Sequence, residues 1–449
     1  MSGEIELEVE VVDTKCIKPS TPTPPHLKTF KLSLLDQLSP NIHGNITLFY
    51  PRTHTNTLHF HAKSQLLQTS LSQTLTRFYP LAGRLHNAAT VHCNDHGATF
   101  IQTRTHATLS DILTPPNFHT LQRLLPSSHD QTLTTSSSNA PILLVRFTSF
   151  RCGAVALTIS LSHKIADIAA LVALLQTWTA AFTAATAPPL PELGAGAALF
   201  PPRDIPGVSA SVKTVSSQKF TSTRLVFDAS KVRELKDKVK SALEVRGHEG
   251  SVFEPSRVEV VLSLIWKCAL SASRSKTASF TRSVMFQAVN LRPRMDPAVA
   301  DAAVGNFVWP FVVTAEEEGH VELHVLVRRM RESMREFLET KAERFKEGGG
   351  FGVVMESLKE RGEVSKKGGV VYKCSSWCKF PLLKVDFGWG EPVWTCSVNN
   401  IVSNTIALMD TKDAAGVEAF VTLDHHEMDL FQQHHELLHY AFINPTLIL

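Results

Sequence analysis

The most informative segment of the chain is residues 154–183, AVALTISLSHKIADIAALVALLQTWTAAFT. Its first part, 154–161, is an uninterrupted apolar run rich in strand-forming residues, which predicts a strand buried on both faces. From residue 168 onward the segment is rich in Ala and Leu and carries no charge, which predicts a buried helix. A buried strand that leads directly into a buried helix is typical of an α/β domain.

A candidate catalytic histidine, His163, lies between this strand and this helix. Pockets form at the ends of strands, and an imidazole exchanges protons near neutral pH. Asp167, four residues on, could fix the loop by pairing with a cation. The pattern H-x-x-x-D is common, so a surface histidine before an Asp-capped helix remains the structural alternative.

The composition of the whole chain excludes several classes of protein. Its 449 residues suffice for two or three domains at roughly 150 residues each. Its 45 Lys and Arg against 42 Asp and Glu leave a net charge of +3, which favours neither nucleic acid nor an anionic membrane as a partner. The first ten residues, MSGEIELEVE, lack the basic and apolar segments of targeting peptides, so we expect a cytoplasmic protein.

The cysteines and the proline-rich stretch inform on redox state and domain organisation. Seven scattered cysteines without a C-x-x-C pair predict reduced thiols and no zinc ribbon. Residues 184–215 are rich in Pro, Ala, Gly and Ser, as expected of a crossover between domains. We therefore predict an N-terminal domain at 1–184, a crossover linker at 185–219 and a C-terminal domain at 220–449. Further elements are expected as helices at 230–243, 258–271 and 321–346 and as strands at 285–289, 384–387, 405–409 and 419–423.

A second motif, VDFGWGEP at 385–392, lies near the end of the chain. Gly388 and Gly390 flank Trp389, which indicates tight backbone turns around a large apolar anchor. Asp386 is either a catalytic carboxylate or the residue that holds a rigid corner in place.

A third motif, HELLH at 435–439, matches the H-E-x-x-H pattern of zinc hydrolases. On a helix, His435 and His439 would share a face and could bind zinc, with Glu436 as the base. The last ten residues contain no third ligand, so a polar C-terminal helix is the alternative. The glycine-rich stretch at 347–352 follows a predicted helix rather than a strand, and the chain has no G-x-S-x-G elbow, so neither a phosphate loop nor a serine hydrolase is expected.

The combination of H-x-x-x-D at 163–167 with D-F-G-W-G at 386–390 closely resembles the plant BAHD family of CoA-dependent acyltransferases. The resemblance extends over nearly the whole chain, and its opening at 17–38 is most similar to the vinorine synthase-like branch of alkaloid and terpenoid acyltransferases. Other family-like stretches are YPLAGRL at 79–85, CNDHGATF at 93–100, SRVEVVLSLIWKCA at 256–269, NLRPR at 290–294 and GNFVWP at 305–310.

This resemblance implies an α/β fold of two chloramphenicol-acetyltransferase-like domains of similar size. Each domain would be a mixed sheet with helices, and a long crossover would join them with a channel in between. His163 would be the general base, and Asp167 would turn away from the substrate to pair with Arg292. The chain departs from many relatives at Ile168, where they have Gly, and at 295–306, which replaces a Pro-rich turn beside the donor.

The resemblance also implies roles for the remaining motif residues. Asp386 is grouped with His163 as a catalytic residue, although the corresponding loop in the family is remote from the channel and shapes the fold. Residues that would support this loop are Gly388, Trp389 and Gly390. Residues that would bind the CoA donor are Ser256, Asn290, Gly305 and Asn306.

The function implied is transfer of an acyl group, acetyl in the first place, from acyl-CoA to a hydroxyl of a plant specialised metabolite such as an alkaloid or terpenoid. An amine is the less expected acceptor. Transfer would be direct, in a ternary complex, with acyl-CoA as co-substrate and no metal or tightly bound cofactor. A monomer without nucleic-acid or membrane partners is expected. The alternatives are a zinc-dependent hydrolase using His435, Glu436 and His439, and a non-catalytic relative that binds a ligand.

Overall fold

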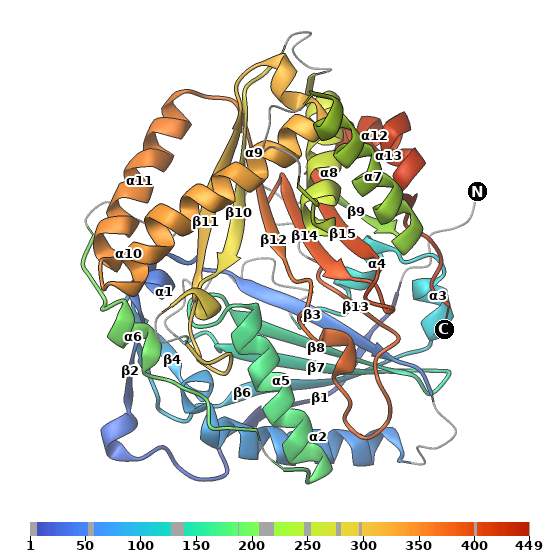
Figure 1. Cartoon of the computed structure of the whole chain (residues 1–449). Coiled ribbons are helices and arrows are strands. Elements are labelled where there is room, and N and C mark those ends of the chain that lie inside the picture. Colours follow the sequence, from blue (N-terminus) through green and yellow to red (C-terminus); the bar gives the residue numbers. More distant parts are fainter. Residues whose placement is uncertain are drawn as a thin grey trace.

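The computed structural model contains two open mixed sheets, one in each half of the molecule (Figure 1). The structure describes residues 7–52, 58–126, 139–186, 188–205, 220–246, 253–274, 280–295, 299–398 and 402–448. The predicted α/β class with two mixed-sheet domains is confirmed. Among the described residues, no helix is long and apolar enough to cross a membrane.

The N-terminal sheet has six strands in the order β1-β6-β7-β8-β3-β13. They are β1 (Glu10–Ile17), β6 (Ala98–Thr105), β7 (Leu143–Phe150), β8 (Val155–Ser162), β3 (His43–Tyr50) and β13 (Trp394–Cys396). The pair β6–β7 is parallel and the other neighbours are antiparallel. β8 is buried along its whole length, which confirms the predicted strand at 154–161.

Two helices, α2 (Phe60–Arg77) and α5 (Ile168–Thr183), cover one face of this sheet (Figure 1). α5 begins directly after the loop that follows β8, as the uncharged Ala/Leu segment predicts. Trp178 on α5 is buried against α2, and its indole Nε1 donates to the Ser70 hydroxyl at 3.0 Å. This packing joins α5 to α2.

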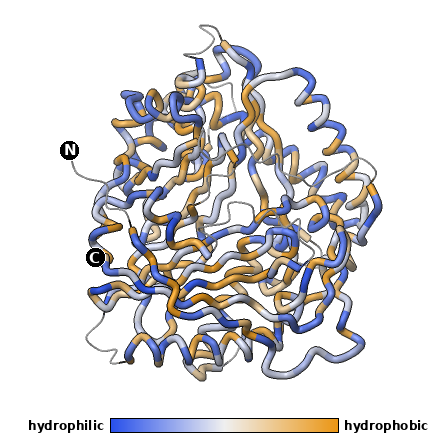
Figure 2. The backbone as a smooth tube through the Cα atoms, turned by 180° about the vertical axis from the view of Figure 1, so that it is seen from behind, coloured by the Kyte–Doolittle hydropathy of each residue, from blue (hydrophilic) through white to orange (hydrophobic). Residues whose placement is uncertain are grey.

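The C-terminal sheet has seven strands in the order β11-β10-β12-β14-β15-β9-β16. They are β11 (Val308–Ala315), β10 (Ser283–Asn290), β12 (Val370–Ser376), β14 (Thr405–Asp410), β15 (Val417–Asp424), β9 (Phe220–Phe227) and β16 (Phe442–Ile443). The strands β10, β12 and β14 run parallel, and the other pairs are antiparallel. Helices packed with this sheet are α7 (Ala229–Arg246), α8 (Arg257–Ser273), α9 (Leu323–Glu336) and α12 (His425–Gln432). Figure 2 shows the strands of both sheets as largely hydrophobic, whereas the outer helices alternate in hydropathy.

Segments from each half of the chain cross into the other half of the molecule. β13 pairs antiparallel with β3, and Trp394 stacks on Phe49 with ring centroids 5.6 Å apart. In the opposite direction, Leu34 and Leu35 of α1 (Leu34–Leu38) belong to the core of the C-terminal half. The two cores therefore interlock, and the boundaries at 184 and 219 stay a prediction because residues 187 and 206–219 lie outside the described part.

Two predicted elements differ from the structure in shape. The helix expected at 321–346 continues from α9 through a π-helical turn at Phe337–Ala342 into α10 (Glu343–Lys346). The strand expected at 384–387 is wrong, because a 3-10 turn at Leu382–Lys384 leads into a tight glycine corner there. The remaining elements are β2 (Thr29–Lys31), β4 (Arg84–Asn87), β5 (Thr90–His92), α3 (Leu109–Leu113), α4 (Phe118–Gln122), α6 (Ala195–Leu199), α11 (Gly350–Lys366) and α13 (His435–Tyr440).

Candidate active site

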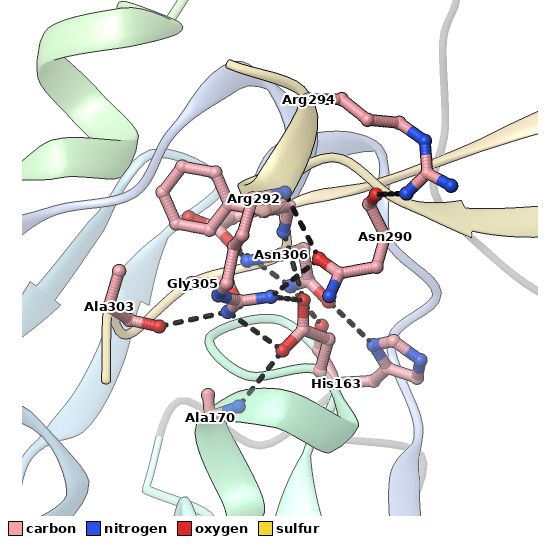
Figure 3. A network of polar contacts seen from close by, with 11 residues as sticks. His163, Ala170, Asn290, Arg292, Arg294, Ala303, Gly305 and Asn306 are labelled. Atoms are coloured by element: carbon pink, nitrogen blue, oxygen red, sulfur yellow. Dashed lines mark hydrogen bonds and ion pairs between the residues drawn. The ribbon is translucent and has the colours of Figure 1, made fainter. Parts of the chain in front are cut away.

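His163 lies in the turn between β8 and α5, and it is half-buried. Its backbone N–H donates to the Ile42 carbonyl at 2.8 Å, which ties the turn to the neighbouring chain segment. The ring Nδ1 lies 2.9 Å from Oδ1 of Asn306, a residue from the other half of the chain (Figure 3). Within the described part of the chain, Nε2 of this ring has no hydrogen-bond partner.

The side-chain amide of Asn306 is held in one orientation by its neighbours. Its Nδ2 donates to Oδ1 of Asp36 and to the His163 carbonyl, each at 2.8 Å. Because both contacts require a donor, the nitrogen must face these two oxygens and Oδ1 must face the imidazole. An amide oxygen can only accept, so Nδ1 of His163 carries the proton. In the neutral ring the lone pair is then on Nε2.

Asp167, the second residue of the motif, points away from the His163 ring into a buried ion pair. Arg292 donates to both carboxylate oxygens of Asp167, at 2.7 and 2.9 Å. The carboxylate also accepts the N–H groups of Ala170, at 3.0 Å, and Phe307, at 3.0 Å. The Arg292 and Asp167 side chains are 0% and 3% exposed, so this bidentate pair locks the start of α5 onto the C-terminal half.

The other contacts of Arg292 organise the segment before β11. Its Nη2 donates to the carbonyls of Ala303, at 2.8 Å, and Gly305, at 3.2 Å. The Asn290 side chain accepts the Arg292 backbone N–H at 3.1 Å. In Figure 3, Asn306 lies between His163 and Arg292, so the histidine and the ion pair are parts of one network.

Asp36 and Lys164 complete this network, and sequence reasoning did not identify either. Asp36 accepts both polar hydrogens that Asn306 directs at it, from the backbone N at 2.7 Å and from Nδ2 at 2.8 Å. Lys164 donates to the Gln37 carbonyl at 2.8 Å, and burial lowers the pKa of its ammonium group to about 8. The S-L-L-D pattern at 33–36 predicts a helix cap, but no local pattern indicates its contact with Asn306.

The D-F-G-W-G loop forms a separate structural unit. Asp386 is exposed, and its Oδ1 accepts the N–H groups of Gly388, at 2.7 Å, and Gly390, at 2.9 Å. Both glycines have a positive φ, +81° and +102°, which other residues adopt only with strain. Trp389 is buried, with its ring centroid 5.9 Å from that of Tyr50. Among the described residues, Asp386 makes no hydrogen bond or ion pair with the His163 network.

Two polar side chains of the H-E-L-L-H motif, Glu436 and His439, are engaged with charged neighbours. Glu436 pairs with Lys238 at 2.9 Å and with Lys267 at 2.7 Å. His439 Nε2 lies 2.6 Å from a Glu234 oxygen. In the part of the chain that the structure describes, no group of three or more His, Cys, Asp or Glu side chains could hold a metal ion. The zinc-hydrolase alternative is therefore not favoured.

The four residues predicted to bind the donor lie in two different places. Ser256 is the N-cap of α8, where its hydroxyl accepts the Glu259 backbone N–H at 3.2 Å. Asn290, Gly305 and Asn306 all belong to the network around Arg292. Their contact with a donor stays a prediction, and their visible contacts give them a part in shaping the site.

The chain is similar to known proteins over nearly its whole length. A family model described as the Transferase family matches residues 7–438. Akuammiline synthase 1 from Alstonia scholaris is 34% identical over 433 residues, which cover 95% of this chain and 96% of that protein. Limonoid 1-O-acetyltransferase from Citrus sinensis is 34% identical over 456 residues, covering 98% and 100%. The crystal structure of vinorine synthase superimposes with a TM-score of 0.83 at 30% identity, covering 97% of this chain and 98% of that one.

The structure thus has two mixed-sheet domains with interlocking cores, and His163 is contacted from both halves of the chain. The chain belongs to the Transferase family, the family of the BAHD acyltransferases, as the pair of motifs at 163–167 and 386–390 predicts. Its predicted similarity to the vinorine synthase-like branch is also confirmed.

Proposed function

We propose that this protein transfers an acyl group, in the first place acetyl, from acyl-CoA to a hydroxyl of an alkaloid or terpenoid of plant specialised metabolism. The relatives named above are one acetyltransferase, which acts on a limonoid, and two synthases, akuammiline synthase 1 and vinorine synthase, and they support this donor and these acceptor classes. The observation that carries the proposal is the state of His163: Nδ1–H is held by Asn306, and Nε2 has a lone pair without a protein partner among the described residues.

In the proposed reaction, Nε2 of His163 takes the proton of the acceptor hydroxyl while its oxygen attacks the thioester carbonyl. A C–O bond forms, and the tetrahedral intermediate then breaks its C–S bond. The CoA thiolate leaves and receives the proton back from the imidazolium. The Asn306 oxygen, 2.9 Å from Nδ1, stabilises the positive ring while it holds the proton.

Asp167, Arg292 and Asp386 have structural roles in this proposal. The Asp167 carboxylate is occupied by Arg292 and by backbone N–H groups, so it has no free position for the substrate. Asp386 accepts two hydrogen bonds within its own loop and fixes a corner of the fold, rather than taking part in the chemistry.

We further infer that donor and acceptor meet between the two halves of the molecule, beside His163. The histidine follows a strand of the N-terminal sheet, whereas Asn306 precedes a strand of the C-terminal sheet. A monomeric, cytoplasmic protein without nucleic-acid or membrane partners remains our expectation.

The experiment that tests the proposal is a screen of alkaloid and terpenoid alcohols with acetyl-CoA, read as CoA release and as acetylated product by mass spectrometry. Because the donor can be tested without an acceptor, the melting temperature with excess acetyl-CoA is measured first. A ligand at 100 times its Kd adds about 2.7 kcal/mol of stability. Donor binding followed by His163-dependent acetylation supports the proposal. If the protein binds neither acetyl-CoA nor CoA, the proposed function is refuted and the protein is a non-catalytic relative.

A further inference from the structure

Asp36 is a buried carboxylate that accepts four hydrogen bonds from other described residues. Its side chain is buried, with the residue 2% exposed. Oδ2 accepts from the Ser33 backbone N, at 2.8 Å, and from the Ser33 hydroxyl, at 2.7 Å. Oδ1 accepts from the backbone N and from Nδ2 of Asn306, at 2.7 and 2.8 Å. The two Asn306 contacts are both N–H donors, so Oδ1 of Asp36 must be an acceptor.

The contact of Asp36 with Asn306 determines which way the Asn306 amide points. If the amide were reversed, its oxygen would face the Asp36 carboxylate and the His163 carbonyl, and its NH₂ group would face Nδ1 of His163. Two acceptor–acceptor contacts in a buried place are costly. The imidazole would then have to accept at Nδ1 and carry its proton on Nε2, where it could not act as a base.

The helix that carries Asp36 is fixed from both halves of the molecule. Leu34 and Leu35 are buried in the C-terminal core, and the Leu34 backbone N donates to the Phe200 carbonyl at 2.9 Å. On the other side, Lys164, the neighbour of His163, donates to the Gln37 carbonyl at 2.8 Å. α1 is therefore a rigid support whose carboxylate is held against Asn306.

A second helix offers a natural control for this arrangement. α3 (Leu109–Leu113) has the same length as α1 and the same capping box, with Thr108 and Asp111 in place of Ser33 and Asp36. Asp111 accepts the Thr108 backbone N–H at 2.6 Å, but it is exposed. Local structure is thus equal at the two sites, whereas burial and the onward contact with Asn306 are found at Asp36.

We propose that Asp36 is a positioning residue for the acyl transfer. Its carboxylate keeps the Asn306 amide in one orientation, and the amide in turn keeps the His163 imidazole in the Nδ1–H tautomer. The proposal rests on the proposed role of His163 as the base. Among the described residues, Asp36 makes no hydrogen bond to the His163 ring, so its effect on the ring passes through Asn306.

The kinetic test compares Asp36→Ala, Asn306→Ala, the double variant and the control Asp111→Ala. The assay is CoA release from acetyl-CoA with the alcohol that reacts fastest in the screen. We expect Asp36→Ala to lower kcat about 10- to 100-fold, the effect of a misplaced catalytic group, with KM for acetyl-CoA nearly unchanged. Asp111→Ala should stay within about twofold of the wild type. The double variant should be no slower than Asn306→Ala, because coupled residues are not additive.

The structural test is the nitrogen spectrum of ¹⁵N-labelled imidazoles, which distinguishes the two neutral tautomers. His163→Gln assigns the signal among the 20 histidines. We expect the Nδ1–H form in the wild type and a loss of this form in Asp36→Ala. If that variant does not fold, Asp36→Asn, which keeps the side-chain volume, is used instead.

Several results would overturn the proposal. The kinetic ones are an unchanged kcat in a folded Asp36 variant, a change in KM for acetyl-CoA alone, and a double variant whose fall in kcat is the product of the two single effects. The spectroscopic one is an Nε2–H tautomer of His163 in the wild type. If the wild-type protein acetylates no alcohol, the proposed function is refuted. The role of Asp36 can still be tested then, because the imidazole spectrum does not depend on activity.

Discussion

The two signature motifs of the chain each contain one aspartate, and the two residues have opposite surroundings. Asp167 is buried, and it joins α5 to the C-terminal half through Arg292. Asp386 is exposed, and its hydrogen bonds within the described part of the chain are short-range, to the N–H groups of Gly388 and Gly390. An aspartate in a signature motif therefore does not have one fixed role. The Asp167 carboxylate connects the two halves of the molecule, whereas the Asp386 carboxylate stabilises a single turn.

This difference has an energetic consequence. Removal of one partner from a buried ion pair leaves an unpaired buried charge, which costs about 3–5 kcal/mol. When an exposed carboxylate is removed, water can bind the N–H groups that donated to it. The loss in the free energy of unfolding is therefore much smaller. In the loop at 386–390, the buried Trp389 rather than the aspartate should carry most of the stability.

The largest effect is expected for Asp167→Ala. Because the variant leaves Arg292 buried without its anion, the free energy of unfolding should fall by about 3–5 kcal/mol. Urea denaturation measures this fall, and activity should decrease together with the folded fraction. A variant that is as stable as the wild type but inactive would show that Asp167 takes a direct part in the chemistry, and the comparison would then fail.

The second-largest loss of stability is expected for Trp389→Ala. The indole packs against Tyr50, Phe147 and Phe182, with ring centroids 5.9, 6.2 and 4.9 Å away. Truncation of a buried Trp costs about 3–5 kcal/mol, and a loss in this range is expected here. Thermal and urea denaturation measure the loss, and Trp389→Phe should recover much of it. A loss below about 1 kcal/mol would contradict the anchoring role.

Asp386→Ala should have a smaller effect. Loss of the two hydrogen bonds to Gly388 and Gly390 should cost about 1 kcal/mol, since the carboxylate is exposed to water. kcat should stay within about threefold of the wild type in the folded enzyme. A fall in kcat as large as that of a general base, without loss of stability, would instead make Asp386 a catalytic residue.

The smallest effect is expected at the H-E-L-L-H motif. Glu436→Gln breaks the ion pairs with Lys238 and Lys267, which are partly exposed and therefore worth about 0–1 kcal/mol. Acetyl transfer should be unchanged in this variant, and also after treatment of the wild type with a metal chelator. Loss of activity in either experiment would revive the zinc alternative.

Local patterns predicted the elements around the site, but not the contacts between them. The apolar run and the uncharged segment correctly predicted β8 and α5, because burial on all sides has a clear signature in one strand and one helix. The expected strand at 384–387 was wrong, because the φ values of Gly388 and Gly390 and the contacts of Asp386 turn the chain into a corner. The pairing of Asp167 with Arg292 was expected only from the family resemblance, and it is seen in the structure.

Asp36 shows where prediction from sequence ends. Its distance from Asn306 is 270 positions along the chain, and the capping box around it is indistinguishable in pattern from the one at Asp111. The two sites differ in burial and in the contact with Asn306: α1 packs into the C-terminal core, whereas Asp111 is exposed. The same holds for Asn306, for which sequence reasoning suggested donor binding and the structure shows a contact with the imidazole.

The most direct test of the central claim is the kcat of His163→Ala for acetyl transfer, measured beside its melting shift with acetyl-CoA. We predict a loss of about 10²- to 10⁴-fold in kcat, the typical contribution of a general base, with the melting shift retained. A variant that still transfers acetyl at nearly the wild-type rate would contradict it.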